Sequence, residues 1–141
     1  MNKLKISDLF LGKVTKPVEK ICYGEVSADA KVYVPNDLLD EMTDSRVDDY
    51  LDEIHRLFRS MKDIKYAWYN RSKKEVGLIC DCLDGDFGLY RYMIVAVQDD
   101  VGNLAVQSWK CISHIDTLIT KGVRLQSTKS AYRSRFFRLG D

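Results

Sequence analysis

The sequence has few of the residues that mark catalytic or cofactor sites. It contains two histidines, and its eight glycines are scattered so that no G-x-G occurs. Phosphate-binding loops need clustered glycines, because only a bare backbone comes close enough to the phosphate oxygens. The longest apolar run, at 93–97, is far shorter than the ~20 residues of a membrane-spanning helix. We therefore expect no phosphate-binding loop, no cofactor and no membrane span.

Prolines are also scarce, and no Gly/Ser/Pro-rich linker divides the 141 residues. The length suits one domain, and 45% apolar with 30% charged residues is ordinary globular composition. The first ten residues alternate charged and apolar side chains and do not resemble an export signal. The four cysteines are therefore expected to be free thiols of a cytoplasmic protein. We predict a single domain, 1–141, with a basic tail at 127–141 whose order the sequence leaves open.

Apolar residues at helical spacing predict one main helix over 45–62. Positions 47, 50, 51, 54, 57, 58 and 61 form a single apolar stripe. Ser45 with Asp48 three residues later resembles a capping box at the helix start. The early charges are mostly acidic and the late ones basic, an order that complements the helix dipole. Residues 36–42 are either a separate turn or an extension of this helix.

Four strand-like segments separated by short polar turns predict an antiparallel β-meander over 64–111. Short turns join neighbouring strands, and neighbours joined in this way run antiparallel. In the first strand, Ile64, Tyr66 and Trp68 are predicted to share one face, because side chains alternate along a strand. The predicted strands are 64–70, 75–82, 89–98 and 104–111.

The flanking segments give weaker signals. A capped helical turn is predicted at 7–12, and a second capping box at Ser113 predicts a short helix over 114–121. Further short strands are predicted at 18–26, 31–34 and 123–126. Together these patterns indicate an α+β fold, in which an antiparallel sheet of four to six strands carries the 45–62 helix on one face.

Three cysteines and a histidine in two regions raise the question of a zinc site. Cys80 and Cys82 lie on one face of a strand, and Cys111 with His114 ends the strand after next. Thiolate and imidazole groups suit zinc. However, same-face neighbours are ~7 Å apart, and an intervening strand adds about twice the ~4.8 Å strand spacing. We therefore expect packed core residues and no metal.

Two other patterns point to chemistry less specifically. Asp81, Asp84 and Asp86 surround a turn but lack the spacing of a calcium loop, so we expect side chains that bind nearby backbone amides. A Cys111–His114 pair is a conceivable nucleophile and base, although no glycine-rich nucleophile turn accompanies it.

The most informative pattern is the segregation of charge. Residues 37–53 hold eight acids against Arg46, and residues 121–138 hold six basic residues and no acid. Such blocks often mark interaction surfaces. The basic segment also interleaves aromatic rings with arginine, which suits stacking on bases as well as protein hot spots. The predicted partner-binding residues are Asp40, Asp44, Asp48, Asp49, Asp52, Glu53, Arg133, Arg135, Phe136, Phe137 and Arg138.

Three functions stay open at this point. The leading hypothesis is a small non-enzymatic binding or regulatory module that acts by protein–protein contact, such as a virus- or prophage-encoded inhibitor of a host enzyme or defence system. The alternative is a nucleic-acid-binding protein that uses the basic aromatic tail and a sheet face. A second alternative is a small hydrolase-like enzyme with a Cys/His/Asp site. For the nucleic-acid alternative, the candidate side chains for stacking on bases from the sheet are Trp68, Tyr69, Tyr90, Tyr92 and Trp109.

Overall fold

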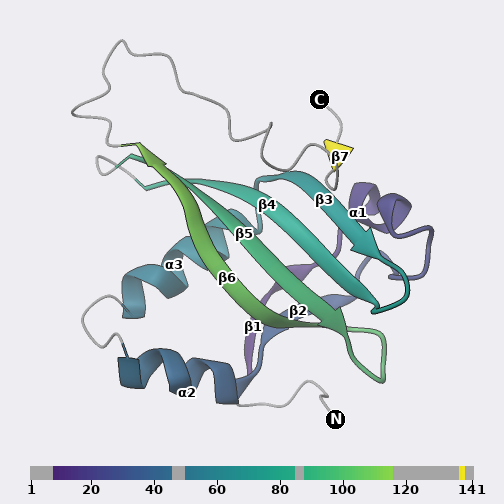
Figure 1. The fold of residues 1–141 in the computed structure, drawn as a ribbon, viewed down its shortest axis with the longest axis horizontal. Coiled ribbons are helices and arrows are strands. Elements are labelled where there is room, and N and C mark those ends of the chain that lie inside the picture. The colour runs from purple at the N-terminus through teal and green to yellow at the C-terminus, as the bar shows by residue number, and fades with distance from the viewer. Residues whose placement is uncertain (1–7, 46–49, 85–87, 116–136, 139–141) are drawn as a thin grey trace.

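The computed structural model describes residues 8–45, 50–84, 88–115 and 137–138 (Figure 1). Within these ranges, three helices accompany a seven-stranded sheet of α+β architecture. The elements are β1 (Leu9–Lys13), α1 (Lys16–Ile21), β2 (Lys31–Val34), α2 (Asn36–Ser45), α3 (Tyr50–Ser60), β3 (Ile64–Asn70), β4 (Glu75–Leu83), β5 (Leu89–Gln98), β6 (Leu104–Ile115) and β7 (Phe137–Arg138). Their order across the sheet is β1-β2-β6-β5-β4-β3-β7.

The predicted meander is confirmed. β3, β4, β5 and β6 pair in succession as antiparallel neighbours. The sheet continues beyond them, because β2 pairs with β6 in parallel and β1 pairs with β2 antiparallel. The sheet is therefore mixed, which corrects the prediction of a purely antiparallel sheet. The parallel pair is possible because α2 and α3 carry the chain from β2 to the far edge of the meander before β3 begins.

The N-terminal elements differ from the prediction. The helical turn predicted at 7–12 is wrong, because Leu9–Lys13 forms strand β1 and its pairing with β2 overrides the local cap signal. The strand predicted at 18–26 is also wrong, because Lys16–Ile21 is helix α1. Pro17 lies in the first turn of α1, where its fixed φ favours a helix and its missing N–H is not needed. The strand predicted at 31–34 is confirmed as β2.

The main predicted helix is confirmed over its apolar part, and residues 46–49 of its first turn lie outside the described residues. Helix α3 spans Tyr50–Ser60 and buries Ile54 and Leu57 of the apolar stripe. Ser45 is the last residue of α2. The rest of the predicted capping box, including Asp48, lies outside the described residues. The segment that begins at residue 36 is a separate helix, α2, which starts directly after Pro35.

The short helix predicted at 114–121 is wrong at its start. His114 and Ile115 belong to β6 and pair with Tyr90 and Leu89 of β5. Because β5 still offers backbone partners at this point, the strand continues past the capping box at Ser113. The rest of that segment, and the strand predicted at 123–126, lie outside the described residues.

Helices α1 and α3 pack on one face of the meander, and the core lies between these layers (Figure 1). Val18 of α1 and Leu57 of α3 meet Leu78, Ile94 and Leu104 of the sheet, and each of the five is at most 1% exposed. None of the helices in the described ranges is both long and apolar enough to cross a membrane.

A β-bulge in β3 changes which residues share a face. Ile64 pairs with Cys80 and Tyr66 pairs with Ile79, so Lys65 is an extra residue in the strand. As a result, Ile64 packs against the core, whereas Tyr66 and Trp68 belong to the opposite face. The prediction that Ile64, Tyr66 and Trp68 share one face is therefore wrong.

Candidate functional site

One end of the core-facing sheet surface gathers charged, aromatic and thiol side chains. A second bulge positions them: Ile112 is an extra residue in β6, so Cys111 and His114 lie on the same face although they are three residues apart. Helix α3 crosses this face. We call the resulting cluster the α3 network; it consists of Glu53, Arg56, Arg59, Asp84, Tyr90, Tyr92, Trp109, Cys111 and His114.

Two arginines of α3 converge on Asp84 in the network. Arg56 Nε donates to Asp84 Oδ2 at 3.1 Å, and Arg59 Nη1 donates to Asp84 Oδ1 at 2.6 Å. Burial alone raises the pKa of Asp84, but hydrogen bonds from Arg59 and Arg56 outweigh burial and lower it. Asp84 is therefore ionised at neutral pH and ties the β4 end to α3.

Glu53 binds the sheet from the preceding turn of the same helix. Its Oε2 accepts a hydrogen bond from Trp109 Nε1 at 3.2 Å, and its Oε1 accepts one from the Tyr92 hydroxyl at 3.5 Å. Arg56 Nη1 lies 3.9 Å from the same Oε1 atom. The carboxylate thus satisfies the polar ends of two core-facing aromatic residues, which explains why those residues are tolerated there.

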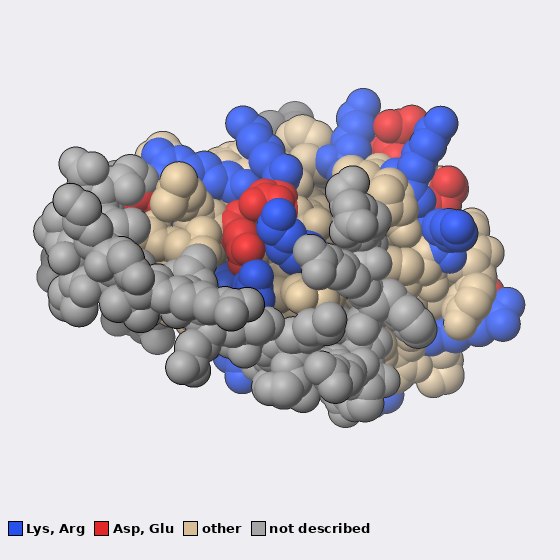
Figure 2. Space-filling model, turned by 90° about the horizontal axis from the view of Figure 1, so that it is seen from above, with Lys and Arg blue, Asp and Glu red and all other residues tan. Residues whose placement is uncertain are grey.

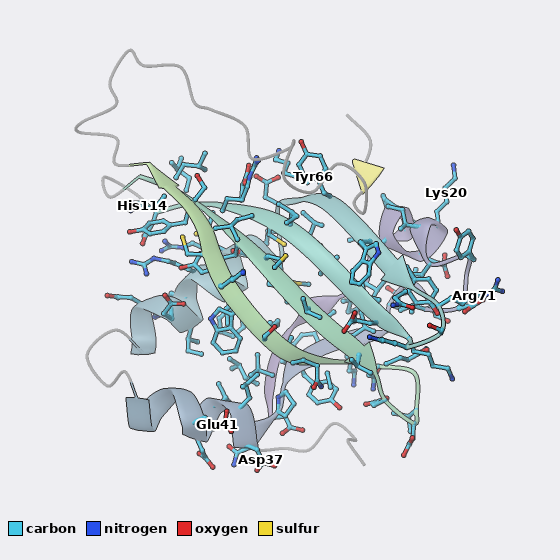
Figure 3. All side chains as sticks on the ribbon, in the orientation of Figure 1. Lys20, Asp37, Glu41, Tyr66, Arg71 and His114 are labelled. Carbon is cyan, nitrogen blue, oxygen red and sulfur yellow. The ribbon has the colours of Figure 1, made fainter. Side chains whose placement is uncertain are left out.

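Tyr90 is contacted by two cationic or titratable groups. The Arg56 guanidinium lies 4.2 Å from the Tyr90 ring centroid. The His114 ring stacks on the same ring at 4.0 Å with an interplanar angle of 6°. Figure 3 shows His114 at the end of β6, beside this cluster. Stacking and cation–π contact of this kind orders the network and leaves Tyr90 engaged within the fold.

The cysteines are separated by tyrosines across the sheet. Tyr92 lies between Cys80 and Cys111, and Tyr90 lies between Cys82 and His114. Among the described residues, no group of three or more His, Cys, Asp or Glu side chains is placed to hold a metal ion. The four side chains considered for zinc therefore share a face without converging.

The thiols are also poorly suited to nucleophilic attack. Burial raises the pKa of Cys22 to about 12 and raises that of Cys80 and Cys82 as well. Burial also raises the pKa of Cys111, whose Sγ donates to the Ser113 carbonyl at 3.3 Å. Because the thiolate is the nucleophile, these raised pKa values favour the unreactive form.

Two acids at the end of β4, Asp81 within the strand and Asp84 directly after it, bind arginines on opposite faces of the sheet. Asp84 belongs to the α3 network, whereas Asp81 lies on the opposite sheet face. Its two carboxylate oxygens accept from Arg91 Nε at 2.6 Å and Arg91 Nη2 at 2.9 Å. Figure 2 shows acidic and basic side chains next to one another on the side of the molecule that it views. The partners of Asp81 and Asp84 are thus guanidinium groups, not the backbone amides that the sequence suggested; Asp86 lies outside the described residues.

The predicted partner-binding acids fall into two environments. Asp40 of α2 and Asp52 of α3 are exposed, whereas Glu53 is half-buried in the α3 network. Figure 3 shows Asp37 and Glu41 of α2 pointing away from the sheet. Asp48 and Asp49 lie outside the described residues, and the side chain of Asp44 is not described.

The predicted basic residues are only partly described. Phe137 and Arg138 form strand β7, which pairs with Ala67 and Tyr66 at the edge of the sheet. The tail is therefore connected to the sheet by backbone pairing at this point. Arg133, Arg135 and Phe136 lie outside the described residues.

Sequence reasoning missed the role of Arg56 and Arg59. They are among the late basic residues of the predicted 45–62 helix, whose charge order suggested only an interaction with the helix dipole, whereas the structure shows that they bind Asp84. The sequence did carry a signal for this role. Arg56 and the buried Leu57 come three and four residues after Glu53, so Glu53 and Arg56 lie on the helix beside the apolar stripe. Charges at that border face the sheet.

No protein-family model matches the chain, and neither a curated protein nor a solved structure matches it.

Proposed function

We propose that this protein is a non-enzymatic binding module that contacts a basic partner protein through the exposed acidic side of α2. We call this side the acidic helix surface; it consists of Asp37, Asp40 and Glu41. The single observation that supports the proposal is the difference between these acids and those of the α3 network. The difference is one of exposure: the side chains of Glu53 and Asp84 are 14% and 20% exposed and bind tryptophan, tyrosine and arginine side chains. All three residues of the acidic helix surface are exposed, and Asp40 Oδ2 accepts from Asn36 Nδ2 at 3.4 Å on the same helix.

The spacing of these acids concentrates charge on one side of the helix. Positions 37, 40 and 41 are three and four residues apart and face the same way. Leu39 is 8% exposed and packs in the core, so the opposite side of α2 holds the helix to the protein. The ten residues of α2 include no lysine or arginine.

The three carboxylates of the acidic helix surface are close enough along α2 to repel one another. Like charges three or four residues apart destabilise a helix by about 0.2–0.5 kcal/mol per pair. A basic partner would relieve this repulsion on binding. The negative potential of the surface would also steer such a partner toward it. This reasoning favours a cationic protein surface as the partner.

A finer proposal concerns the consequence of binding. A row of carboxylates on a helix resembles a row of phosphates in its spacing of negative charge. The module then acts as a virus- or prophage-encoded inhibitor that occupies the anion-binding surface of a host enzyme or defence protein.

The experiment compares capture of partners by the full chain and two variants. Asp40→Lys reverses one charge on the acidic helix surface, and Asp100→Lys reverses one exposed charge in the β5–β6 turn. Both variants change the net charge equally. We expect a partner, identified by mass spectrometry, that wild type and Asp100→Lys retain and that Asp40→Lys loses. Retention of the same proteins by all three chains contradicts the proposal.

A further inference from the structure

The residue that follows helix α1 has a left-handed backbone although it carries a large ring. Tyr23 has a φ of 56°. Its N–H donates to the Lys20 carbonyl at 3.1 Å, and the N–H of Gly24 donates to the Glu19 carbonyl at 3.0 Å. These two bonds form a Schellman motif, in which glycine usually occupies the left-handed position. Tyrosine there bears a backbone strain that glycine would avoid.

Burial does not compensate for this strain. The Tyr23 side chain is 70% exposed. Its ring is 6.3 Å from the Tyr69 ring, and the Arg71 guanidinium lies 5.6 Å from its centroid. A strained residue whose side chain stays at the surface is a candidate for a binding role, because packing gives no other reason for it.

A second strained residue lies at the same corner. Lys74 has a φ of 53°, and its N–H donates to the carbonyl of Arg71, the residue whose guanidinium contacts Tyr23. Asp29 is the remaining non-glycine residue with positive φ among those described, and aspartate tolerates this conformation. The two poorly suited residues, Tyr23 and Lys74, are therefore joined through Arg71.

Exposed cations gather at the same corner as the ring, and the two nearby acids have partners within the fold. Glu19 Oε2 accepts from the Ala28 N–H at 2.9 Å. Glu25 accepts from the Tyr69 hydroxyl at 2.8 Å and pairs with Arg71, which holds the guanidinium beside the ring. Figure 3 shows Lys20 and Arg71 projecting outward at this end of the molecule. We call this surface the Tyr23 corner; it consists of Lys20, Tyr23, Arg71, Lys73 and Lys74, all of them exposed.

We propose that the Tyr23 corner binds single-stranded nucleic acid. The Tyr23 ring stacks on an unpaired base, and the lysines contact the flanking phosphates. The three lysines favour nucleic acid over an acidic protein, because lysine is depleted in protein–protein interfaces and binds phosphate as a point charge. The corner is separate from the acidic helix surface, and this inference goes beyond the proposed function.

The first test separates binding from stability with one substitution. Tyr23→Gly removes the ring and relieves the backbone strain. Binding of a fluorescein-labelled 20-nucleotide oligothymidylate, measured by anisotropy at low salt, should weaken about tenfold. The midpoint of thermal unfolding should stay the same or rise by about 2–4 °C. Unchanged affinity, or no binding by the wild type, overturns the proposal.

The second test locates the phosphate contacts. Lys20→Gln/Lys73→Gln/Lys74→Gln removes three charges from the corner, and Arg133→Gln/Arg135→Gln/Arg138→Gln removes three from the basic tail. We expect the corner variant to bind weakly. The slope of log K against log salt should become less steep by about 2, because three phosphate contacts are removed. The tail variant should bind within about twofold of wild type, a difference below 0.5 kcal/mol. The reverse pattern overturns the assignment.

Two competitors test the class of partner. A duplex of equal length should compete poorly, because its bases are already stacked, and an oligoglutamate peptide of equal charge should compete poorly because it has no bases. If the peptide competes as well as the oligonucleotide, the corner recognises acidic protein and the proposal is wrong. If the duplex competes as well, base stacking by Tyr23 is excluded.

Discussion

Helices α2 and α3 follow one another in the chain and both carry acidic residues, but they use them in opposite ways. On α3, Glu53 accepts hydrogen bonds from Trp109 and Tyr92 and contributes to the fold. On α2, Asp37 and Asp40 lie at the surface. The difference teaches that a block of like charge is not one functional unit. Each carboxylate has to be assigned by what it contacts.

The largest expected loss of stability follows from removing the carboxylate of Asp81, which lies on the sheet face opposite α3. Asp81 is 8% exposed and binds Arg91 through both oxygens. Asp81→Ala leaves a half-buried guanidinium without this carboxylate, so we expect a loss of about 3 kcal/mol in the free energy of unfolding. Urea denaturation measures it.

The matched control is an exposed pair near the same site. Asp63 Oδ1 lies 3.0 Å from Lys65 Nζ, and both side chains are more than 40% exposed. Asp63→Ala should change the free energy of unfolding by less than about 1 kcal/mol. Equal losses for the two variants would show that burial does not separate engaged from exposed charges in this protein.

A smaller loss is expected for Glu53→Ala. The substitution leaves the indole N–H of Trp109 without this acceptor, which should lower the free energy of unfolding by about 1–2 kcal/mol. Asp52→Ala, at the exposed neighbouring position, should change it by less than about 0.5 kcal/mol. Urea denaturation followed by tryptophan fluorescence measures both. If Glu53→Ala is neutral for stability and instead abolishes partner capture, Glu53 belongs to the binding surface.

The smallest stability effect depends on pH. The pKa of Asp84 is lowered in the folded protein, so its contribution is complete above the unfolded value of about 3.9. It is lost as the pH falls through the lower folded pKa. Asp84→Asn should therefore be less stable than wild type by about 1 kcal/mol at pH 7. Thermal unfolding of both chains from pH 7 to pH 2 should show this difference in stability disappearing below about pH 4. A difference that stays constant with pH contradicts the ion pair.

The sequence predicts those parts of the fold that depend on local periodicity. The four meander strands alternate side chains and are separated by clear turns, so their pairing follows from short-range rules. The apolar stripe of α3 is equally local. The strand continuation through His114 and the parallel β2–β6 pair depend on distant backbone partners, which local capping signals do not report.

The candidate surfaces divide in the same way. The acidity of α2 is evident from composition, whereas the engagement of Glu53 depends on how α3 lies on the sheet. Bulges at Lys65 and Ile112 shift the faces of Tyr66 and His114, and the sequence carries no clear signal for either. Tyr23 was missed because its significance is its backbone conformation, which its residue type does not suggest.

The most direct test of the contrast between α2 and α3 is the affinity of a captured and purified partner, titrated by calorimetry against three chains. Asp40→Lys should bind at least about tenfold more weakly than wild type, because like charges then face one another, while its free energy of unfolding changes by less than about 0.5 kcal/mol. Asp100→Lys should bind within about twofold of wild type, since it lies outside the acidic helix surface. Equal affinities for Asp40→Lys and wild type, or equal losses for the two variants, would contradict the account.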